Sequence, residues 1–433
     1  MKTFEESVES LNWTQEKEPV WLRNYRTRAF EKFRKIGFPD RHHEAWKYIR
    51  LESILKTTLR RSDLKDSAEL AYSFEIPKLH PKENLLVFVD GIYSPEHSSL
   101  QNEKGLSIET FKTSKPEHLD TIQTLTETTL EKETNAFALI NAFNFSDGVV
   151  IRISENASIE NPIRLVFMED KNVQFKQIYH SKIVVLAEAK SKSNIILEHT
   201  GNGFENYFAN FNIEIHCQKH SRIHWTTIGE NSFHFVTNRV FLSESADFNL
   251  VTLNLDQSFV RDETWVHLIG ENATCSLAGT SVLDYDAQAY QHTVVNHLVP
   301  SCTSRQIYKN ILSGNSKTEF NSMVHAHRNA QKSDSNQLNK NLILSDSARA
   351  YSRPQLKIYT DDVKATHGSA TGPLLNEELF YLRSRGIDPK EAQAVLTFGF
   401  AEEVLELIEL PLLRSKLEGR IRILLEQTIR KQK

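Results

Sequence analysis

The stretch from about residue 148 to residue 365 is a long series of short strand-like runs with no helical pattern between them. In its clearest run, "ANFNIEIHC" (209–217), the odd-numbered residues from Ala209 to Cys217 are apolar and the even-numbered ones are polar. Because side chains alternate between the two faces of a strand, this run predicts a strand with one buried and one exposed face. So many short strands in succession restrict the fold to a β-helix or a β-sandwich.

Small-residue pairs precede several of these runs. Asn and Ser suit tight turns because their side chains hydrogen-bond the local backbone, and Ala fits a crowded corner. The spacing of the pairs often falls within the roughly 20–50 residues typical of solenoid repeats. We therefore favour a β-helix, with a β-sandwich as the alternative. The pairs are Asn156-Ala157, Ser245-Ala246, Asn272-Ala273, Asn329-Ala330 and Ser347-Ala348.

Helical patterns flank the β region on both sides. Residues 1–60 carry apolar residues at helical spacing, and Asp90-Gly91 predicts a hairpin before a further helix at roughly 115–143. The fold class is therefore mainly β, with helices at both ends. We expect an N-terminal helical and mixed region at 1–147, a parallel β-helix core at 148–372 and a C-terminal helical domain at 373–433.

The C-terminal region has the pattern of several short helices. Asn376 is expected to cap the first of them. Asp388, followed by Pro at the first helical position, is expected to cap the second, which ends before Gly399. Further helices are predicted at 401–410 and 412–431.

Composition excludes several classes of function. A formal net charge of −4 argues against a chain that mainly binds nucleic acid or anionic membrane. Cys217, Cys275 and Cys302 are too scattered for a disulfide framework or a C-x-x-C site, so we expect buried thiols in a reducing compartment. The longest apolar runs fall far below the roughly 18 residues of a membrane span, and we expect a cytoplasmic protein.

The sequence lacks the common catalytic motifs. The run "SGNSKTEF" (313–320) contains the Lys-Thr pair that closes a phosphate-binding loop motif, but it lacks the glycines that this motif requires. Neither G-x-S-x-G nor H-E-x-x-H occurs. We expect a non-enzymatic chain, with any nucleotide hydrolysis supplied by another protein.

Most histidines are expected to be structural. His325 and His327 would project from one face of a strand, as a metal pair does, but no third ligand is identifiable. The same expectation holds for His292, His297 and the adjacent His42 and His43.

His367 stands apart because of its setting in "DDVKATHGSATG" (361–372), which the sequence suggests is a polar connector between the β region and the helical tail. Imidazole is a borderline ligand that suits iron, zinc or copper, and it titrates near neutral pH. A loop histidine that hydrogen-bonds the backbone is the structural alternative.

The residues around this histidine resemble a known family. The block "RPQLKIYTDDVKATHGSATGPLLNEELFYLRSRGIDPKEAQAVLTFGF" (353–400) is similar to the C-terminal signature of the SufD branch of the SufB/SufD family of iron–sulfur cluster assembly subunits. The resemblance continues through 330–356 and 135–163 and, more loosely, 37–49. It therefore extends over nearly the whole chain.

The resemblance implies a right-handed parallel β-helix flanked by helical regions. It also implies a scaffold in a SufBCD complex, in which the chain pairs with the paralogue SufB and docks the ATPase SufC. The isolated chain is expected to carry no cofactor, and a nascent iron–sulfur cluster would lie transiently at the SufB interface. The SufC-docking residues would be Phe380, Tyr381, Arg383, Arg385 and Phe398.

The functional histidine of the family falls on His367. Many members carry Cys where this chain has Ala365. Because thiolate is the softest iron ligand available, its absence means that sulfur ligands for a cluster at His367 would come from another chain.

Three alternatives remain open from the sequence. The first is a SufB-like cluster scaffold. The second is a carbohydrate-active β-helix enzyme, which a fold alone does not establish and for which no paired-acid motif is evident. The third is a self-associating protein: unpaired strand edges predict a homodimer of the isolated chain, replaced by a SufB heterodimer in the complex.

Overall fold

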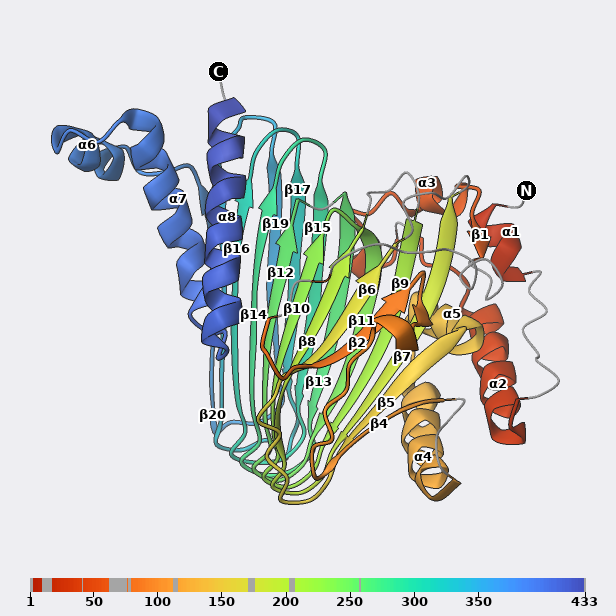
Figure 1. Cartoon of the computed structure of the whole chain (residues 1–433). Coiled ribbons are helices and arrows are strands. Elements are labelled where there is room, and N and C mark those ends of the chain that lie inside the picture. The colour runs from red at the N-terminus through yellow and green to blue at the C-terminus, as the bar shows by residue number, and fades with distance from the viewer. Residues whose placement is uncertain are drawn as a thin grey trace.

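The computed structural model of the chain describes residues 3–9, 18–40, 42–61, 76, 79–111, 116–169, 176–201, 207–256 and 258–431. It has a mainly β architecture, a parallel β-solenoid of about 7 turns with helices at both ends (Figure 1). The mainly β fold class expected from the sequence is confirmed, and the β-sandwich alternative is wrong because the solenoid strands pair in parallel with strands two positions away along the chain.

Two sheets of 10 strands form the walls of the solenoid, and from β5 onward successive strands alternate between them. One sheet, called the odd sheet here, contains β1 (Arg60–Arg61), β4 (Leu106–Thr110), β5 (Asp147–Ile153), β7 (Gln177–Ala187), β9 (Tyr207–Cys217), β11 (Phe233–Leu242), β13 (Phe259–Leu268), β15 (Gln288–His297), β17 (Lys317–Ala326) and β19 (Arg349–Ile358). The other, called the even sheet, contains β2 (Asn84–Val89), β3 (Ile92–Tyr93), β6 (Ile163–Met168), β8 (Lys192–Thr200), β10 (Arg222–Glu230), β12 (Asp247–Leu255), β14 (Thr274–Leu283), β16 (Thr303–Leu312), β18 (Ser333–Ile343) and β20 (Val363–Gly372).

Three of the five predicted corner pairs of the solenoid have a left-handed turn residue, whereas Asn329 and Ser347 are not among the residues with positive φ. Asn156, Ser245 and Asn272 all adopt positive φ, between 54° and 61°. Asn tolerates this left-handed conformation better than most residues, because its short side chain can hydrogen-bond locally. Ala246 and Ala273, which follow two of these residues, are fully buried, so a larger side chain would not fit inside the corner.

The strand predicted from "ANFNIEIHC" is β9, but the prediction that one of its faces is exposed is wrong. The apolar residues from Ala209 to Cys217 do enter the core between the sheets. The opposite face is covered by the N-terminal helices: Asn210 and Glu214 are buried, and Asn210 donates to the Phe137 carbonyl at 2.9 Å. Polar residues face outward here because they bond to the covering helix rather than to water.

N-terminal helices cover the outer face of the odd sheet and build a second core with it. The predicted helix at 115–143 is two helices, because Asn135 interrupts it and caps the second through bonds to the amides of Phe137 and Ala138. The helices and 3₁₀ turns of this half are α1 (Phe4–Glu9), α2 (Val20–Ile36), η1 (Glu44–Trp46), α3 (Leu51–Leu55), η2 (Pro95–His97), α4 (Pro116–Lys132) and α5 (Ala136–Asn144).

The C-terminal helices are α6 (Asn376–Ser384), α7 (Pro389–Leu405) and α8 (Pro411–Lys431), and of these α7 and α8 pack on the even sheet. Asp388 caps α7 as predicted, accepting from the Lys390 amide at 2.9 Å. Three boundaries are corrected. Asn376 is the first residue of α6 and makes no capping bond from its side chain; α7 runs through the exposed Gly399, where the helix costs only about 1 kcal/mol relative to Ala; and 401–410 is no separate helix.

Two smaller predictions are also settled. Asp90 and Gly91 form the two-residue turn between β2 and β3, both with positive φ, as an Asp-Gly hairpin requires.

Among the helices that the described residues form, none is long and apolar enough to cross a membrane.

One buried histidine predicts how stability depends on pH. His297 lies inside the solenoid, where its Nε2 is 2.9 Å from the Ser304 hydroxyl. Burial lowers its pKa to about 4, although the Asp334 carboxylate acts in the opposite direction. Because the unfolded histidine, with a pKa of about 6.5, binds a proton first, the stabilisation is complete above about pH 6.5 and is lost as the pH falls toward 4.

We expect His297→Gln to remove this part of the acid sensitivity. Between pH 7.5 and 5.5 the free energy of unfolding should fall by about 1 kcal/mol more in the wild type than in the variant, measured by urea denaturation. His220→Gln, which changes an exposed histidine on a turn, is the control. Equal pH dependence of the wild type and His297→Gln would contradict the prediction.

Candidate functional site

His367 lies on β20, the last strand of the solenoid. The prediction that 361–372 is a connector is therefore wrong. The segment pairs in parallel with β18 over 10 residues. The polar, small-residue composition did not prevent a strand because the preceding turn supplies a complete backbone template. His367 is thus held at a fixed register on the edge of the even sheet.

The register determines the side to which His367 points. His367 pairs with Gln337 of β18, which is fully buried inside the solenoid. Paired residues of neighbouring parallel strands project to the same side of a sheet, so His367 faces the interior side of the last turn. It is nevertheless exposed, since no further strand lies over it.

Ala365 lies two residues before His367 on the same side of β20, opposite Ser335. The chain's three cysteines are buried elsewhere in the solenoid, as expected. Burial raises the pKa of the Cys217 thiol to about 12 and that of Cys302 to about 11, and it raises the pKa of Cys275 too. These thiols are therefore protonated at neutral pH and do not supply thiolate next to His367.

The end of the solenoid formed by β19 and β20, called the open end here, exposes the outer edge of both sheets. Each edge strand presents backbone amides and carbonyls on the side that has no neighbouring strand. Apolar side chains are exposed beside it, including Ile358 and Tyr359, the latter 58% exposed. The sequence analysis predicted unpaired strand edges at the ends of the β-helix, but it did not place His367 on one of them, because it interpreted 361–372 as a connector rather than a strand.

The proposed docking residues separate into two groups. Phe380 and Tyr381 on α6 are 72% and 57% exposed, and Arg383 and Arg385 on and beside this helix are exposed too. The Arg385 guanidinium lies 5.2 Å from the Tyr381 ring centroid. No residue of α6 is buried, and the helix projects away from the solenoid (Figure 1).

Phe398 belongs to the second group. It is only 5% exposed and packs in the core between the C-terminal helices and the even sheet. The Arg422 guanidinium covers its ring at 3.5 Å from the centroid. Phe398 therefore fixes α7 in place rather than presenting a surface to another molecule.

A cavity of about 710 Å³ lies between the last strands of the even sheet and helices α6 and α7. Its walls include Leu342 of β18, Ala370 of β20, and Leu375, Val395 and Phe400 from the helical side. The largely apolar cavity adjoins both β20 and α6, so the strand that carries His367 and the exposed helix share one boundary.

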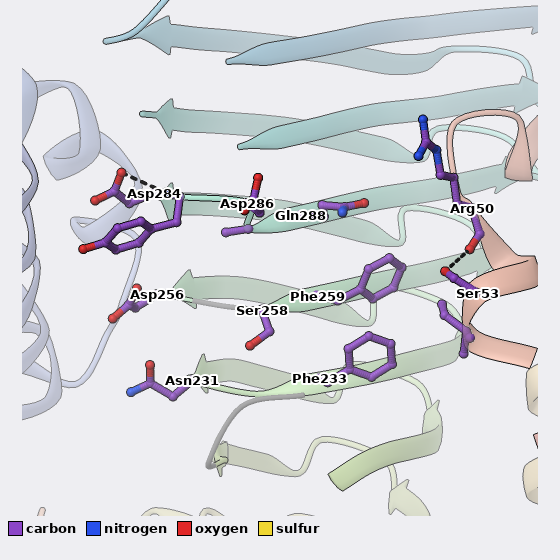
Figure 2. A pocket seen from close by; sticks show the side chains of 13 residues that line it. Arg50, Ser53, Asn231, Phe233, Asp256, Ser258, Phe259, Asp284, Asp286 and Gln288 are labelled. Carbon is purple, nitrogen blue, oxygen red and sulfur yellow. Dashed lines mark hydrogen bonds between the residues drawn. The ribbon is translucent and has the colours of Figure 1, made fainter. Parts of the chain in front are cut away.

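A second cavity, of about 530 Å³, lies on the outer face of the odd sheet. Figure 2 shows Phe233 and Phe259 between Asp256 and Asp284 at one end and Arg50 at the other. The two phenyl rings stack with centroids 4.8 Å apart. Within the described part of the chain no three His, Cys, Asp or Glu side chains converge on a metal position.

The other histidines singled out from the sequence lie outside β20, although His325 on β17 pairs with Lys357 of the edge strand β19 and its ring lies 5.2 Å from that of Tyr359. His325 and His327 stack with ring centroids 3.8 Å apart, and the described residues provide no third ligand of the common types. His292 is 3.3 Å from a Glu263 carboxylate oxygen, as a structural histidine would be.

The fold and the open end place the chain in the class of parallel β-solenoid proteins with a helical layer on each sheet. Comparison with known proteins identifies the family. Residues 167–400 match the SufBD core domain of the SUF system for iron–sulfur cluster assembly, and residues 2–165 match the SufBD N-terminal region. The chain belongs to the SufBD family of iron–sulfur cluster assembly proteins.

Curated relatives agree with this assignment over most of their length. The iron–sulfur cluster assembly protein SufD of Escherichia coli is 27% identical over 89% of this chain and 89% of its own. A SufBD family protein of Synechocystis is 24% identical over 93% of this chain and 90% of its own. One from Staphylococcus saprophyticus is 23% identical over 89% and 85%.

The two groups of docking residues lead to opposite expectations for stability. Phe398→Ala should lower the free energy of unfolding by about 3–5 kcal/mol, because it leaves a cavity in the core under Arg422. Phe380→Ala should change it by less than about 0.5 kcal/mol, because the ring is mostly in solvent. Urea denaturation of the two variants measures both; a large loss in Phe380→Ala would mean that α6 is packed rather than exposed.

Proposed function

We propose that the chain is a non-catalytic scaffold subunit that pairs with a SufB-like paralogue through its open end and carries a SufC-like ATPase on its C-terminal helices. The observation that supports the proposal most directly is the open end itself. Two sheets end there in unpaired edge strands, and one of these strands carries an exposed histidine on its interior side.

Pairing through the open end follows from the chemistry of edge strands. An exposed edge is a template for another strand, and a chain with the same solenoid offers edges of the same spacing. The exposed Ile358 and Tyr359 would be covered in the same contact. In the isolated chain the same edges are available to a second copy, which supports a homodimer until the paralogue binds.

The nascent cluster is cargo of such a complex. The His367 imidazole supplies one ligand of borderline character from this chain. Ala365 supplies none, and the buried cysteines are protonated, so sulfur ligands come from the partner subunit. The same facts disfavour the SufB-like alternative, in which this chain would contribute the thiolates.

The C-terminal helices offer the docking surface for an ATPase. Phe380 and Tyr381 are large aromatic side chains in solvent, and aromatic residues and arginine dominate binding energy at protein interfaces. Arg383 and Arg385 add positive charge to the same helix end. Residues of α6 and of β20 line the same cavity. A displacement of α6 by a bound ATPase would therefore act close to the strand that carries His367.

Replacing His367 tests the proposed ligand role. In a complex co-expressed with the paralogue and the ATPase, His367→Ala should lower bound iron and sulfide by about tenfold or more while the three chains still co-purify. His220→Ala, an exposed histidine on a solenoid turn, is the matched control. Unchanged iron and sulfide would remove the ligand role, and failure of the wild-type chains to associate would overturn the scaffold proposal.

Replacing the exposed aromatic residues of α6 tests the docking surface. The double variant Phe380→Ala/Tyr381→Ala should weaken ATPase binding by roughly 30-fold or more, as expected for loss of interface hot spots. Isothermal titration calorimetry with the purified ATPase measures it. Val20→Ala changes an equally exposed apolar residue on α2 and should bind like the wild type. Wild-type affinity of the double variant would place the docking surface elsewhere.

A further inference from the structure

One cavity of the protein takes no part in the proposed scaffold function. It is the cavity of about 530 Å³ on the outer face of the odd sheet. The stacked rings of Phe233 and Phe259, the first residues of β11 and β13, lie in its middle. Figure 2 shows Asp256 and Asp284 on one side of these rings and Arg50 on the other. The cavity therefore has an anionic end, an apolar middle and a cationic end.

Two turns of the solenoid build the anionic end. Asp256 lies in the turn before β13, and Asp284 and Asp286 lie in the turn before β15. Arg50 is the one basic side chain among the described residues that line the cavity. Since the lining carries more negative than positive charge, it is complementary to a ligand that brings a cation to this end.

Tyr285 adds an aromatic ring to the anionic end, and it does so in an unusual backbone conformation. Its φ is 51°, in the left-handed region that Asn231 and Asp256 occupy in the turns before β11 and β13. Asn and Asp tolerate this region because their short side chains hydrogen-bond locally, whereas a bulky aromatic residue is strained there. The ring is 61% exposed, so burial of the side chain does not offset this strain. The turn displays an aromatic surface at a cost in backbone energy, as functional sites do.

The chain itself supplies an example of the group that the anionic end holds. Lys431, the last residue of α8, places its ammonium nitrogen 3.7 Å from an Asp284 carboxylate oxygen and 4.6 Å from the Tyr285 ring centroid. The Tyr285 phenol and the carboxylates of Asp284 and Asp256 raise the pKa of Lys431. An alkylammonium over an aromatic ring and beside a carboxylate is a cation–π arrangement. Because the Lys431 side chain is 51% exposed, its ion pair is weak and a stronger cationic ligand displaces it.

The order of charges and rings restricts the class of ligand. A volume of about 530 Å³ falls within the range of roughly 300–1,000 Å³ that is typical of ligand sites. A small cation would use only the anionic end and would leave the two phenyl rings and Arg50 without a role. A short extended peptide matches all three parts of the cavity when it carries a basic residue, aliphatic residues and an acidic residue in sequence. The group that already lies at the anionic end is itself a lysine side chain of a polypeptide.

We infer that this cavity is a docking site for an extended peptide segment of a partner protein, with a basic residue at one end and an acidic residue at the other. The basic side chain takes the place of Lys431 beside the aspartates, the aliphatic residues cover the two phenyl rings, and the acidic side chain pairs with Arg50. Lys431 is thus a tethered competitor for the site. The site is separate from the open end and from α6, and it does not depend on the proposed scaffold function.

Short labelled peptides are the probes for this site. The peptides Lys-Leu-Leu-Glu and Glu-Leu-Leu-Lys have capped termini and carry fluorescein on a glycine spacer, and fluorescence anisotropy measures their binding to the full chain. Both orders are used because the cavity accepts an extended segment in one of two directions. We expect one of the two to bind at least about tenfold more tightly than the neutral Gln-Leu-Leu-Gln, which lacks both charges.

Substitutions at the two ends locate the bound peptide. Asp256→Asn/Asp284→Asn removes two charges while Asn still tolerates the left-handed turn, and it should weaken binding by about tenfold or more. Arg50→Gln should weaken it by about threefold or more. Lys431→Ala should instead tighten binding by about threefold, because the tethered competitor is gone. Lys219→Ala removes a similarly exposed lysine that pairs with a carboxylate at 2.8 Å on another turn, and it should bind like the wild type.

Each contrary outcome overturns the inference. If neither charged peptide binds the wild-type chain more tightly than the neutral one, the cavity is not a peptide site. If a peptide binds with unchanged affinity to Asp256→Asn/Asp284→Asn, or no more tightly to Lys431→Ala, it lies elsewhere. If spermidine displaces the peptide at equal concentration, the site takes a small polyamine rather than a peptide. Circular dichroism checks the fold of each variant, and Lys431→Ala, a change at an exposed helix end, tests the site without altering its walls.

Discussion

Parallel pairing of each strand from β5 onward with the strand two positions along the chain is the constraint on which the rest of the structure depends. Each turn places its apolar residues over those of the previous turn, so the core between the sheets is continuous only while another turn follows. The last turn has no successor. Its interior-facing residues, His367 among them, are therefore exposed on the edge of the sheet.

Each sheet of the solenoid also has an outer face, and the helical layers cover these two faces. N-terminal helices pack on the odd sheet and C-terminal helices on the even sheet. Where a layer covers polar residues, bonds and ion pairs replace water: Arg239 contacts Glu133 and Glu263 at 2.7 and 2.9 Å. Such buried pairs cost desolvation, and removal of one member leaves a charge without compensation.

Much of the fold was predictable because local physics and the global fold agree there. Alternation in 209–217, the Asn-Ala and Ser-Ala corners, the Asp90-Gly91 turn and the Asp388 cap all act within a few residues. The errors have the opposite origin. The outer face of β9 is buried by helices more than 60 residues away in the chain, and β20 is a strand only because β18 lies beside it.

The sequence by itself determined the order of the elements, the alternation that makes a solenoid, the family and the position of His367 within it. Only the tertiary structure decided which residues are accessible. It exposed Phe380 and buried Phe398, although both are aromatic residues of predicted helices, and it brought His199 and His234 together across 35 positions. Periodicity specifies the face of an element, but what covers that face depends on distant segments of the chain.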